Sequence, residues 1–148
     1  MEVKNLLNPE VKAEIINRIK RLTPATQRKW GQMDVAQMLA HTQAPLKVAI
    51  GQHQLKGGFL IRWFGPLFKG ILYNDTPYKK NIATDKSFKI AGQREFEKER
   101  QQLLETIEIF CEEYLRKDRH PYFGKLTTEQ WGKSAWKHLD HHLRQFGV

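Results

Sequence analysis

The chain has 148 residues, and its 25 Lys and Arg against 16 Asp and Glu give a net charge of +9 with His neutral. This length suits a single domain over residues 1–148, because two cores of ordinary size need about 200 residues or more. The 40% hydrophobic content is ordinary for a globular protein and excludes a disordered or collagen-like chain. The single Cys cannot form an internal disulfide, which favours a reducing compartment.

No stretch of the sequence is apolar enough to span a membrane or to act as a secretory signal. The most apolar segment, Gly58 to Tyr73, is interrupted by two basic residues and a proline. It falls short of the roughly 18 apolar residues that a span requires. The N-terminal sequence MEVKNLLNPEVKAE lacks the apolar core of a signal peptide. We therefore expect a cytoplasmic protein with no membrane partner.

The excess of basic residues makes nucleic acid a candidate partner. However, Lys and Arg are spread along the whole chain and usually lie beside acidic residues, as in REFEKER. Such spacing is typical of a solvated surface, so we predict no specific nucleic-acid binding. The alternative, a basic nucleic-acid-binding protein, requires these residues to converge on one surface.

Three of the predicted helices have recognisable N-caps. The first begins at Asn8 and ends near Thr23, and apolar residues recur along it at one-turn spacing. The second opens at Asp34 and the last at Thr127, and each has a Gln three residues later that completes a capping box. Gly147 is placed to end the last helix.

The longest helical period predicts a third helix from about Gly92 to Arg116. Cys111 belongs to its apolar stripe, so we interpret this residue as a small buried hydrophobe rather than a nucleophile. The stripe consists of Phe96, Leu103, Ile107, Phe110, Cys111 and Tyr114.

Four helices without a hairpin motif predict an all-α fold, an up-down-up-down four-helix bundle. The segment from Gly51 to Ile90 is too long for a plain turn, so we expect it to form a crossover between the second and third helices. Within it, Phe59 to Leu72 is expected to form a short helix broken near Gly65 and Pro66.

The crossover also carries an aromatic cluster within residues 58–73. We interpret this cluster chiefly as packing, with a pocket lid or a partner surface as the alternatives. Its members are Phe59, Trp63, Phe64 and Phe68.

The last helix, WGKSAWKHLDHHLRQFG, carries the residues that point most directly to chemistry. His138 and His142 are one turn apart on the face expected to meet the core, with His141 at the edge of that face. Two such histidines can hold one divalent ion. The alternatives are core histidines satisfied by hydrogen bonds, or an exposed His-rich end. The opposite face, away from the expected core, carries Lys133, Lys137, Asp140 and Arg144.

Three further polar residues are candidates for the site. His41 lies near the apolar stripe of the second helix, and a bundle usually builds a site from facing helices; its alternative is an edge histidine of no consequence. His120, on the connection entering the last helix, is a weak candidate for acid–base catalysis. Its alternative is a structural turn with Pro121 and Gly124. Gln145 shares the face of the His pair, where it either hydrogen-bonds near the site or lines the bundle end.

The segments GQMDVAQMLAHT and KHLDHHLRQF resemble the DinB-like (YfiT-like) superfamily of metalloenzymes. Within it, WGQMDVAQMLAH, HPYFGKLT and HHLRQFG are similar to a branch known only as a domain of unknown function. The resemblance runs from Trp30 to the end of the chain and is weakest from Gly51 to Ile90. It implies the bundle fold and a divalent metal bound by His41, His138 and His142. Zinc and nickel are the metals expected, with manganese as a further candidate.

Relatives with known activity use the metal to activate low-molecular-weight thiols for transfer or isomerisation. The resemblance therefore implies an enzyme that activates a small thiol or water for transfer or hydrolysis on a small-molecule substrate. Three neutral imidazoles leave the ion its full charge and an open position. No carboxylate is visibly paired with them, which favours thiol activation over hydrolysis. The alternative is a non-catalytic metal-binding bundle. The resemblance and the aromatic crossover together also predict a homodimer.

Overall fold

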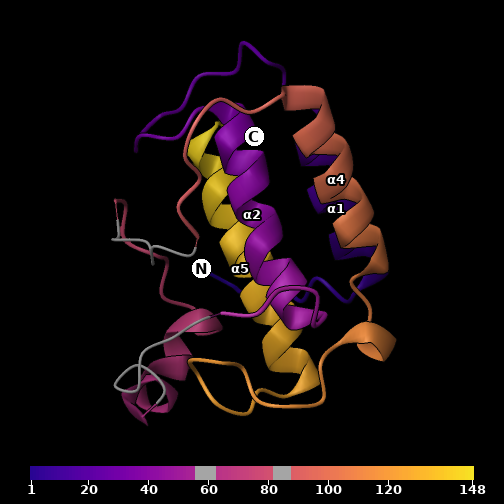
Figure 1. Cartoon of the computed structure of the whole chain (residues 1–148), viewed down its shortest axis with the longest axis vertical. Helices are drawn as coiled ribbons and strands as arrows, with labels where there is room; N and C mark the ends of the chain where they lie inside the picture. Colours follow the sequence, from indigo (N-terminus) through magenta and orange to yellow (C-terminus); the bar gives the residue numbers. More distant parts are fainter. Residues whose placement is uncertain (56–62, 82–87) are drawn as a thin grey trace.

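The computed structural model describes residues 1–55, 63–81 and 88–148, and this part of the chain is helical, with no strand. Figure 1 shows the four labelled α-helices side by side along the long axis of the molecule, with α5 behind α2 and α1 behind α4. The all-helical class is thus confirmed, while the up-down-up-down bundle topology stays a prediction. The elements in chain order are α1 (Pro9–Lys20), α2 (Val35–Ala49), the 3-10 helix η1 (Gly65–Leu72), α4 (Phe96–Ile109), the 3-10 turn η3 (Glu112–Tyr114) and α5 (Thr128–Gln145).

The predicted helix starts are confirmed in atomic detail. The Asn8 side chain accepts hydrogen bonds from the backbone N–H groups of Glu10 (2.8 Å) and Val11 (3.3 Å). Asp34 and Thr127 each form the complete capping box that the sequence predicts. Because these bonds satisfy N–H groups that have no acceptor within the helix, they fix where α1, α2 and α5 begin.

Helix α4 is shorter than predicted, since it covers Phe96–Ile109 rather than Gly92 to Arg116. The chain leaves the helical conformation at Phe110, whose side chain is completely buried. The carbonyl of Phe110 accepts a hydrogen bond from the Lys12 ammonium of α1 (2.9 Å). A contact with another helix therefore takes the place of the next intrahelical bond.

The segment after α4 is held by the end of α2. The backbone N–H of Arg116 donates to the carbonyl of Ala49 (2.8 Å), and Leu115 beside it is buried. The last part of the predicted apolar stripe is consequently wrong, because Cys111 is only partly buried and Tyr114 is exposed. Helical periodicity stops at Phe110, so the positions that follow no longer share a face with the helix.

Helix α5 is buried on more than the face that carries its histidines. Lys137 and Asp140, on the opposite face, are only 1% and 7% exposed. The ammonium of Lys137 donates to the carbonyls of Ile71 (2.7 Å) and Asn74 (2.8 Å), and Asp140 pairs with Arg18 of α1 (2.8 Å). The expectation that this face points away from the core is therefore wrong for Lys137 and Asp140, which the crossover and α1 cover, while Arg144 is exposed as expected.

The crossover packs against the loop that precedes α5. A side chain at Gly65, where η1 begins, would collide with the backbone carbonyl of Tyr122, so only glycine allows this approach. The helix predicted over Phe59 to Leu72 thus exists from Gly65 onward as η1, and Pro66 stands in its first turn. Residues 59–62 of that prediction lie outside the described residues, whereas Trp63 and Phe64 are described and helical.

Three described members of the aromatic cluster, Trp63, Phe64 and Phe68, are exposed. Figure 1 shows η1 at one end of the molecule, away from α1 and α4. The interpretation of the cluster as packing is therefore wrong for Phe64 and Phe68, and the lid and partner-surface alternatives remain. The exposed fractions are 67% for Trp63, 50% for Phe64, 77% for Leu67, 65% for Phe68 and 49% for Ile71.

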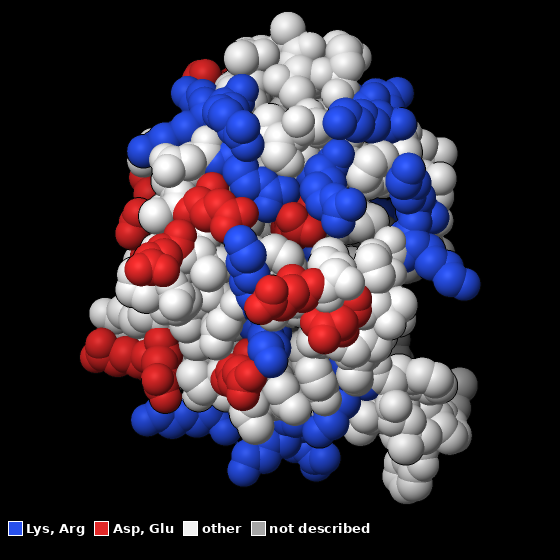
Figure 2. Space-filling model, turned by 180° about the vertical axis from the view of Figure 1, so that it is seen from behind, with Lys and Arg blue, Asp and Glu red and all other residues white. Residues whose placement is uncertain are grey.

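Charged side chains of both signs share the molecular surface. On the face shown in Figure 2, acidic and basic residues alternate over the middle, and basic residues gather toward the two ends. Within the described ranges, no helix is long and apolar enough to cross a membrane.

Candidate metal centre

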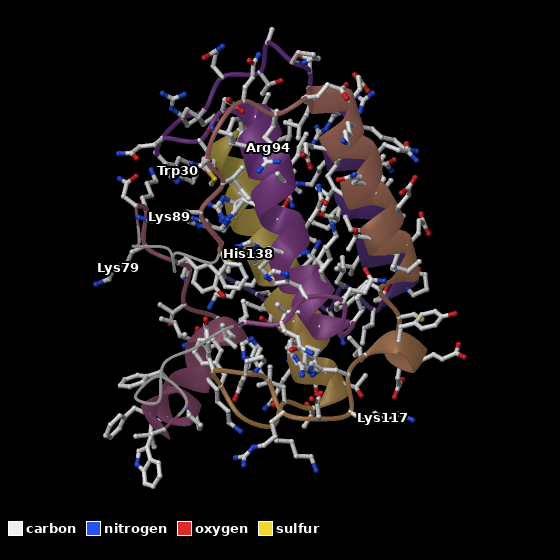
Figure 3. The ribbon with its side chains drawn as sticks, viewed as in Figure 1. Trp30, Lys79, Lys89, Arg94, Lys117 and His138 are labelled. Atoms are coloured by element: carbon white, nitrogen blue, oxygen red, sulfur yellow. The ribbon has the colours of Figure 1, made fainter. Side chains whose placement is uncertain are left out.

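Three histidines from two helices meet inside the helical layer. His41 comes from α2, and His138 and His142 come from successive turns of α5. Their ring centroids lie 4.7 to 5.0 Å apart, and one ring nitrogen from each lies within 4.8 Å of the others. Figure 3 shows His138 between α5 and α2. The structure therefore brings together all three residues that the sequence singled out as metal ligands.

Hydrogen bonds fix the tautomers of His41 and His142. Nδ1 of His41 lies 2.9 Å from the carbonyl oxygen of Phe88, and Nδ1 of His142 lies 2.8 Å from Oε1 of Gln145. Because both of these oxygens can only accept, each Nδ1 must carry the proton. The lone pair of each ring is therefore on Nε2, the atom left for a metal.

Gln145 is itself oriented by a second hydrogen bond. Its amide nitrogen donates to the backbone carbonyl of Trp30 (2.7 Å), which leaves the amide oxygen facing His142. Trp30 and Gly31 lie close against this end of α5, and a side chain at Gly31 would collide with the Gln145 amide. The loop before α2 thus determines the orientation of an α5 histidine.

The spacing of the ring nitrogens fits one shared cation. Nε2 of His138 lies 3.2 Å from Nε2 of His41. Two nitrogen ligands of one tetrahedral zinc ion lie about 3.3 Å apart when each bond is about 2.0–2.1 Å. Since His41 carries its proton on Nδ1, the short contact requires either a proton on Nε2 of His138 or a cation that both nitrogens bind.

Burial keeps all three rings neutral. It lowers the pKa of His41, against a smaller raising effect of the Phe88 carbonyl. It lowers the pKa of His142 to about 3, assisted by the neighbouring His41. The pKa of His138 falls well below its usual range for the same reason, because the ring is buried beside two other histidines. Neutral imidazoles are the ligand form, so the triad is ready to bind a cation at pH 7.

The group contains no acidic ligand. Among the described residues, the cluster able to hold a metal consists of the three histidines alone. Asp140, the nearest acidic residue along α5, is turned to Arg18, and Cys111 lies outside the cluster. A donor set of three neutral nitrogens is typical of catalytic rather than structural zinc sites.

His141 and His120 lie outside the triad. The His141 ring contacts the rings of Trp30 (5.9 Å), Tyr78 (5.6 Å) and His142 (5.0 Å). That placement agrees with its expected position at the edge of the histidine face.

His120 forms part of a tight turn instead. Its Nδ1 accepts the backbone N–H groups of Tyr122 (3.0 Å) and Phe123 (3.2 Å), and its ring stacks on Trp131 (5.3 Å). Its backbone pairs with Gly124. These contacts agree with the structural-turn alternative. The turn is also distant from the triad along α5, because Trp131 lies about two helical turns before His138.

Sequence reasoning identified one supporting residue and missed two. Gln145 was expected to hydrogen-bond near the site or to line the bundle end, and it does hydrogen-bond to His142. Phe88 and Trp30 were missed because each contributes a backbone carbonyl, and no side-chain pattern marks such a group.

Comparison with known proteins identifies a family for this chain. A family described as "Protein of unknown function (DUF1569)" matches residues 1–147. The chain belongs to this family. No curated protein and no solved structure matches it. The DUF1569 membership agrees with the expected uncharacterised branch, while the link of that branch to the DinB-like superfamily belongs to the proposal that follows.

Proposed function

We propose that this chain is a DinB-like metal-dependent enzyme in which His41, His138 and His142 bind one divalent ion. Zinc or nickel is the expected metal, with manganese as a further candidate. The observation that carries the proposal is the 3.2 Å separation of the Nε2 atoms of His41 and His138, in a triad where His41 and His142 donate their Nδ1 protons to other groups. The fold that positions the triad is an up-down-up-down four-helix bundle.

The triad would leave one coordination position of the metal open to a substrate. Three protein ligands leave one position of a tetrahedral site open, and three neutral rings leave the charge of the ion undiminished. When bound, such an ion supplies the Lewis acidity that lowers the pKa of a small thiol or water molecule at the open position. Phe88 and Gln145 hold the rings of His41 and His142 in place, so little reorganisation is needed.

The lack of a carboxylate in the triad favours a thiol over water as the activated group. Hydrolysis commonly needs a base to move a proton, and the described cluster contains histidines only. A thiol has a pKa of about 8.5 and ionises near neutral pH with the help of the cation alone. We therefore propose transfer of a small thiol to a small-molecule substrate, with hydrolysis as the second reaction.

Replacement of the metal by cobalt tests for an open position. The stripped protein is loaded with one equivalent of Co²⁺, and the visible spectrum is recorded while 2-mercaptoethanol is added. We expect a sulfur-to-cobalt charge-transfer band that saturates, and no such band in His138→Ala. Cobalt that binds the triad without any spectral response to the thiol would refute the enzyme and favour the alternative, a non-catalytic metal-binding bundle.

We also propose that the chain forms a homodimer through η1. Leu67, Phe68 and Ile71 of this helix are all exposed, and Lys69 is the one charged residue in it. A second copy can cover these side chains with little repulsion between like charges, although the whole chain carries +9. Sedimentation equilibrium should show a dimer at tens of micromolar, and Leu67→Lys should dissociate it. A wild-type monomer at that concentration would refute the proposal.

Specific nucleic-acid binding is not proposed, because charges of both signs share the surface shown in Figure 2. Any binding of DNA should be weak and fall steeply with salt.

A further inference from the structure

A pocket of about 440 Å³ opens at the C-terminal end of α5, next to the histidine triad. His141 stands in its wall, and the ring of His141 lies 5.0 Å from that of His142. The volume is in the usual range for sites that take small molecules. Of the α5 histidines, His141 lines the pocket, whereas His138 and His142 do not.

Positive charge predominates in the pocket wall. Its charged side chains are those of Lys29, Lys80, Lys137, Arg144 and Asp140. The one acid is already paired with Arg18 (2.8 Å) and also lies near Arg144 (3.8 Å). Within residues 1–55, 63–81 and 88–148, neither Lys29 nor Lys80 has an acidic partner.

Lys137 is a buried source of this charge. All three of its ammonium protons are used on oxygens of Ile71 and Asn74, at 2.7 to 2.8 Å. Those acceptors are neutral and hold the ammonium in place, while burial lowers the pKa of Lys137 against a smaller raising effect of Asp75. Since the side chain is only 1% exposed, water screens that charge poorly and the pocket retains a positive potential.

Two aromatic rings form flat, apolar parts of the same wall. The Lys80 ammonium lies 4.6 Å from the centre of the Trp30 ring, and the Lys137 ammonium lies 4.5 Å from the centre of the Tyr78 ring. Both rings are also in edge contact with His141. Cations therefore stand over aromatic surfaces, an arrangement that suits a ligand with an anionic group and a planar or apolar body.

The pocket and the triad share one structural connection. Gln145 binds the backbone of Trp30 with its amide nitrogen and His142 with its amide oxygen, and its own carbonyl accepts the N–H of Lys29 (2.7 Å). Two residues of the pocket wall are thus fixed to the last turn of the helix that carries the histidines. A ligand held by this wall has a defined position relative to His142.

We propose that this pocket binds the negatively charged end of a small organic anion, a carboxylate or a phosphate. The proposal stands apart from the proposed metal chemistry, because none of the three histidines lines the pocket. It concerns a binding step only, since Lys29 and Lys80 attract the anion while Trp30 and Tyr78 contact its body.

Ligands of similar shape but different charge show how much the negative charge contributes to binding affinity. Benzoate, phenyl phosphate and neutral benzamide are titrated calorimetrically into the full chain, with and without zinc. We expect benzoate or phenyl phosphate to bind at least about tenfold more tightly than benzamide, a difference of about 1.4 kcal/mol. Whichever anion binds better identifies the preferred group. Equal affinity of all three, or no binding below about 10 mM, would overturn the proposal.

Two variants locate the binding. Lys29→Gln combined with Lys80→Gln should weaken the preferred anion about tenfold and leave benzamide unchanged. Lys79→Gln is the matched control, because Lys79 points away from the molecule in Figure 3. An anion affinity in the double variant equal to that of the control would refute the pocket.

Zinc titrations of the same samples keep the two proposals apart. The double variant should bind zinc like the wild type, because neither lysine contacts the triad. Wild-type protein that binds zinc but shows no preference for the anions over benzamide would refute the pocket alone. Anion selectivity without any zinc binding would instead refute the proposed function.

Discussion

His120 and the histidine triad are both shielded from water and both held neutral. Their Nδ1 atoms, however, have opposite roles in hydrogen bonding. At His120, Nδ1 accepts two backbone N–H groups, so its lone pair is consumed within the turn. At His41 and His142, Nδ1 donates to an oxygen, so the lone pair on Nε2 stays available. The direction of the Nδ1 hydrogen bond therefore distinguishes a histidine that stabilises a turn from one that is prepared to bind a cation.

The largest expected effect is the loss of metal from the triad. His138→Ala or His142→Ala should abolish stoichiometric binding of zinc, nickel and manganese, because two remaining imidazoles make a poor site. Calorimetry on metal-stripped protein measures this directly. His120→Ala and His141→Ala are the controls and should retain binding. Unchanged affinity in both ligand variants would remove the basis of the proposed enzyme.

The next effect concerns the group that orients a ligand. Gln145→Ala should lower zinc affinity about 10–100-fold, because His142 loses the acceptor that holds its proton on Nδ1. Gly31→Ala should lower it in the same direction by displacing the Gln145 amide. Competition with a chromophoric chelator measures both affinities. Wild-type affinity in Gln145→Ala would show that the observed hydrogen bond does not support binding.

A smaller effect should appear in stability at the turn. His120→Ala leaves the N–H groups of Tyr122 and Phe123 without their acceptor, which should cost about 1–3 kcal/mol of unfolding free energy. His120→Asn should recover part of that loss, since an Asn side chain can accept the same bonds. Urea melts of the metal-free protein provide the comparison. Equal stability of both variants and the wild type would contradict the turn assignment.

The smallest effect is in the pH dependence of that stability. Burial, with Arg116 nearby, lowers the pKa of His120 to about 4, against about 6.5 in an unfolded chain. The unfolded state therefore binds more protons between these two values, so this histidine favours folding above pH 6.5 and loses its contribution as pH falls towards 4. The expected slope is about 1.4 kcal/mol per pH unit.

His120→Asn provides the control for this pH effect. Relative to that variant, wild-type protein should lose unfolding free energy more steeply between about pH 6.5 and pH 5 in urea melts. Parallel curves for the two proteins would show that His120 titrates alike in the folded and unfolded states.

Local sequence determined where α1, α2 and α5 begin but not where α4 begins or ends. The caps at Asn8, Asp34 and Thr127 were predictable because each involves hydrogen bonds within three residues. The end of α4 was not, because it depends on Lys12 bonding the carbonyl of Phe110 almost a hundred residues away. The apolar periodicity therefore predicts a longer helix than the one that forms, because it contains no signal of the tertiary contact that ends the helix.

The ligands of the candidate site were predictable for a similar reason. His138 and His142 are four residues apart on one helix, His41 lies near the apolar stripe of another, and the resemblance implied that all three are ligands. The carbonyls of Phe88 and Trp30 have no side-chain signature, so only the folded chain shows them. The burial of Lys137 was also missed, because one amphipathic face was expected on α5 and the crossover covers a second.

A crystal of the protein grown with zinc provides the most direct test of the metal centre. We expect an anomalous difference peak between α2 and α5, with Nε2 of His41, His138 and His142 each at about 2.0–2.1 Å from its centre. No zinc should lie at His120, whose lone pair is occupied within its turn. A peak bound by other residues, or three histidines joined only by hydrogen bonds in the presence of excess zinc, would contradict the account.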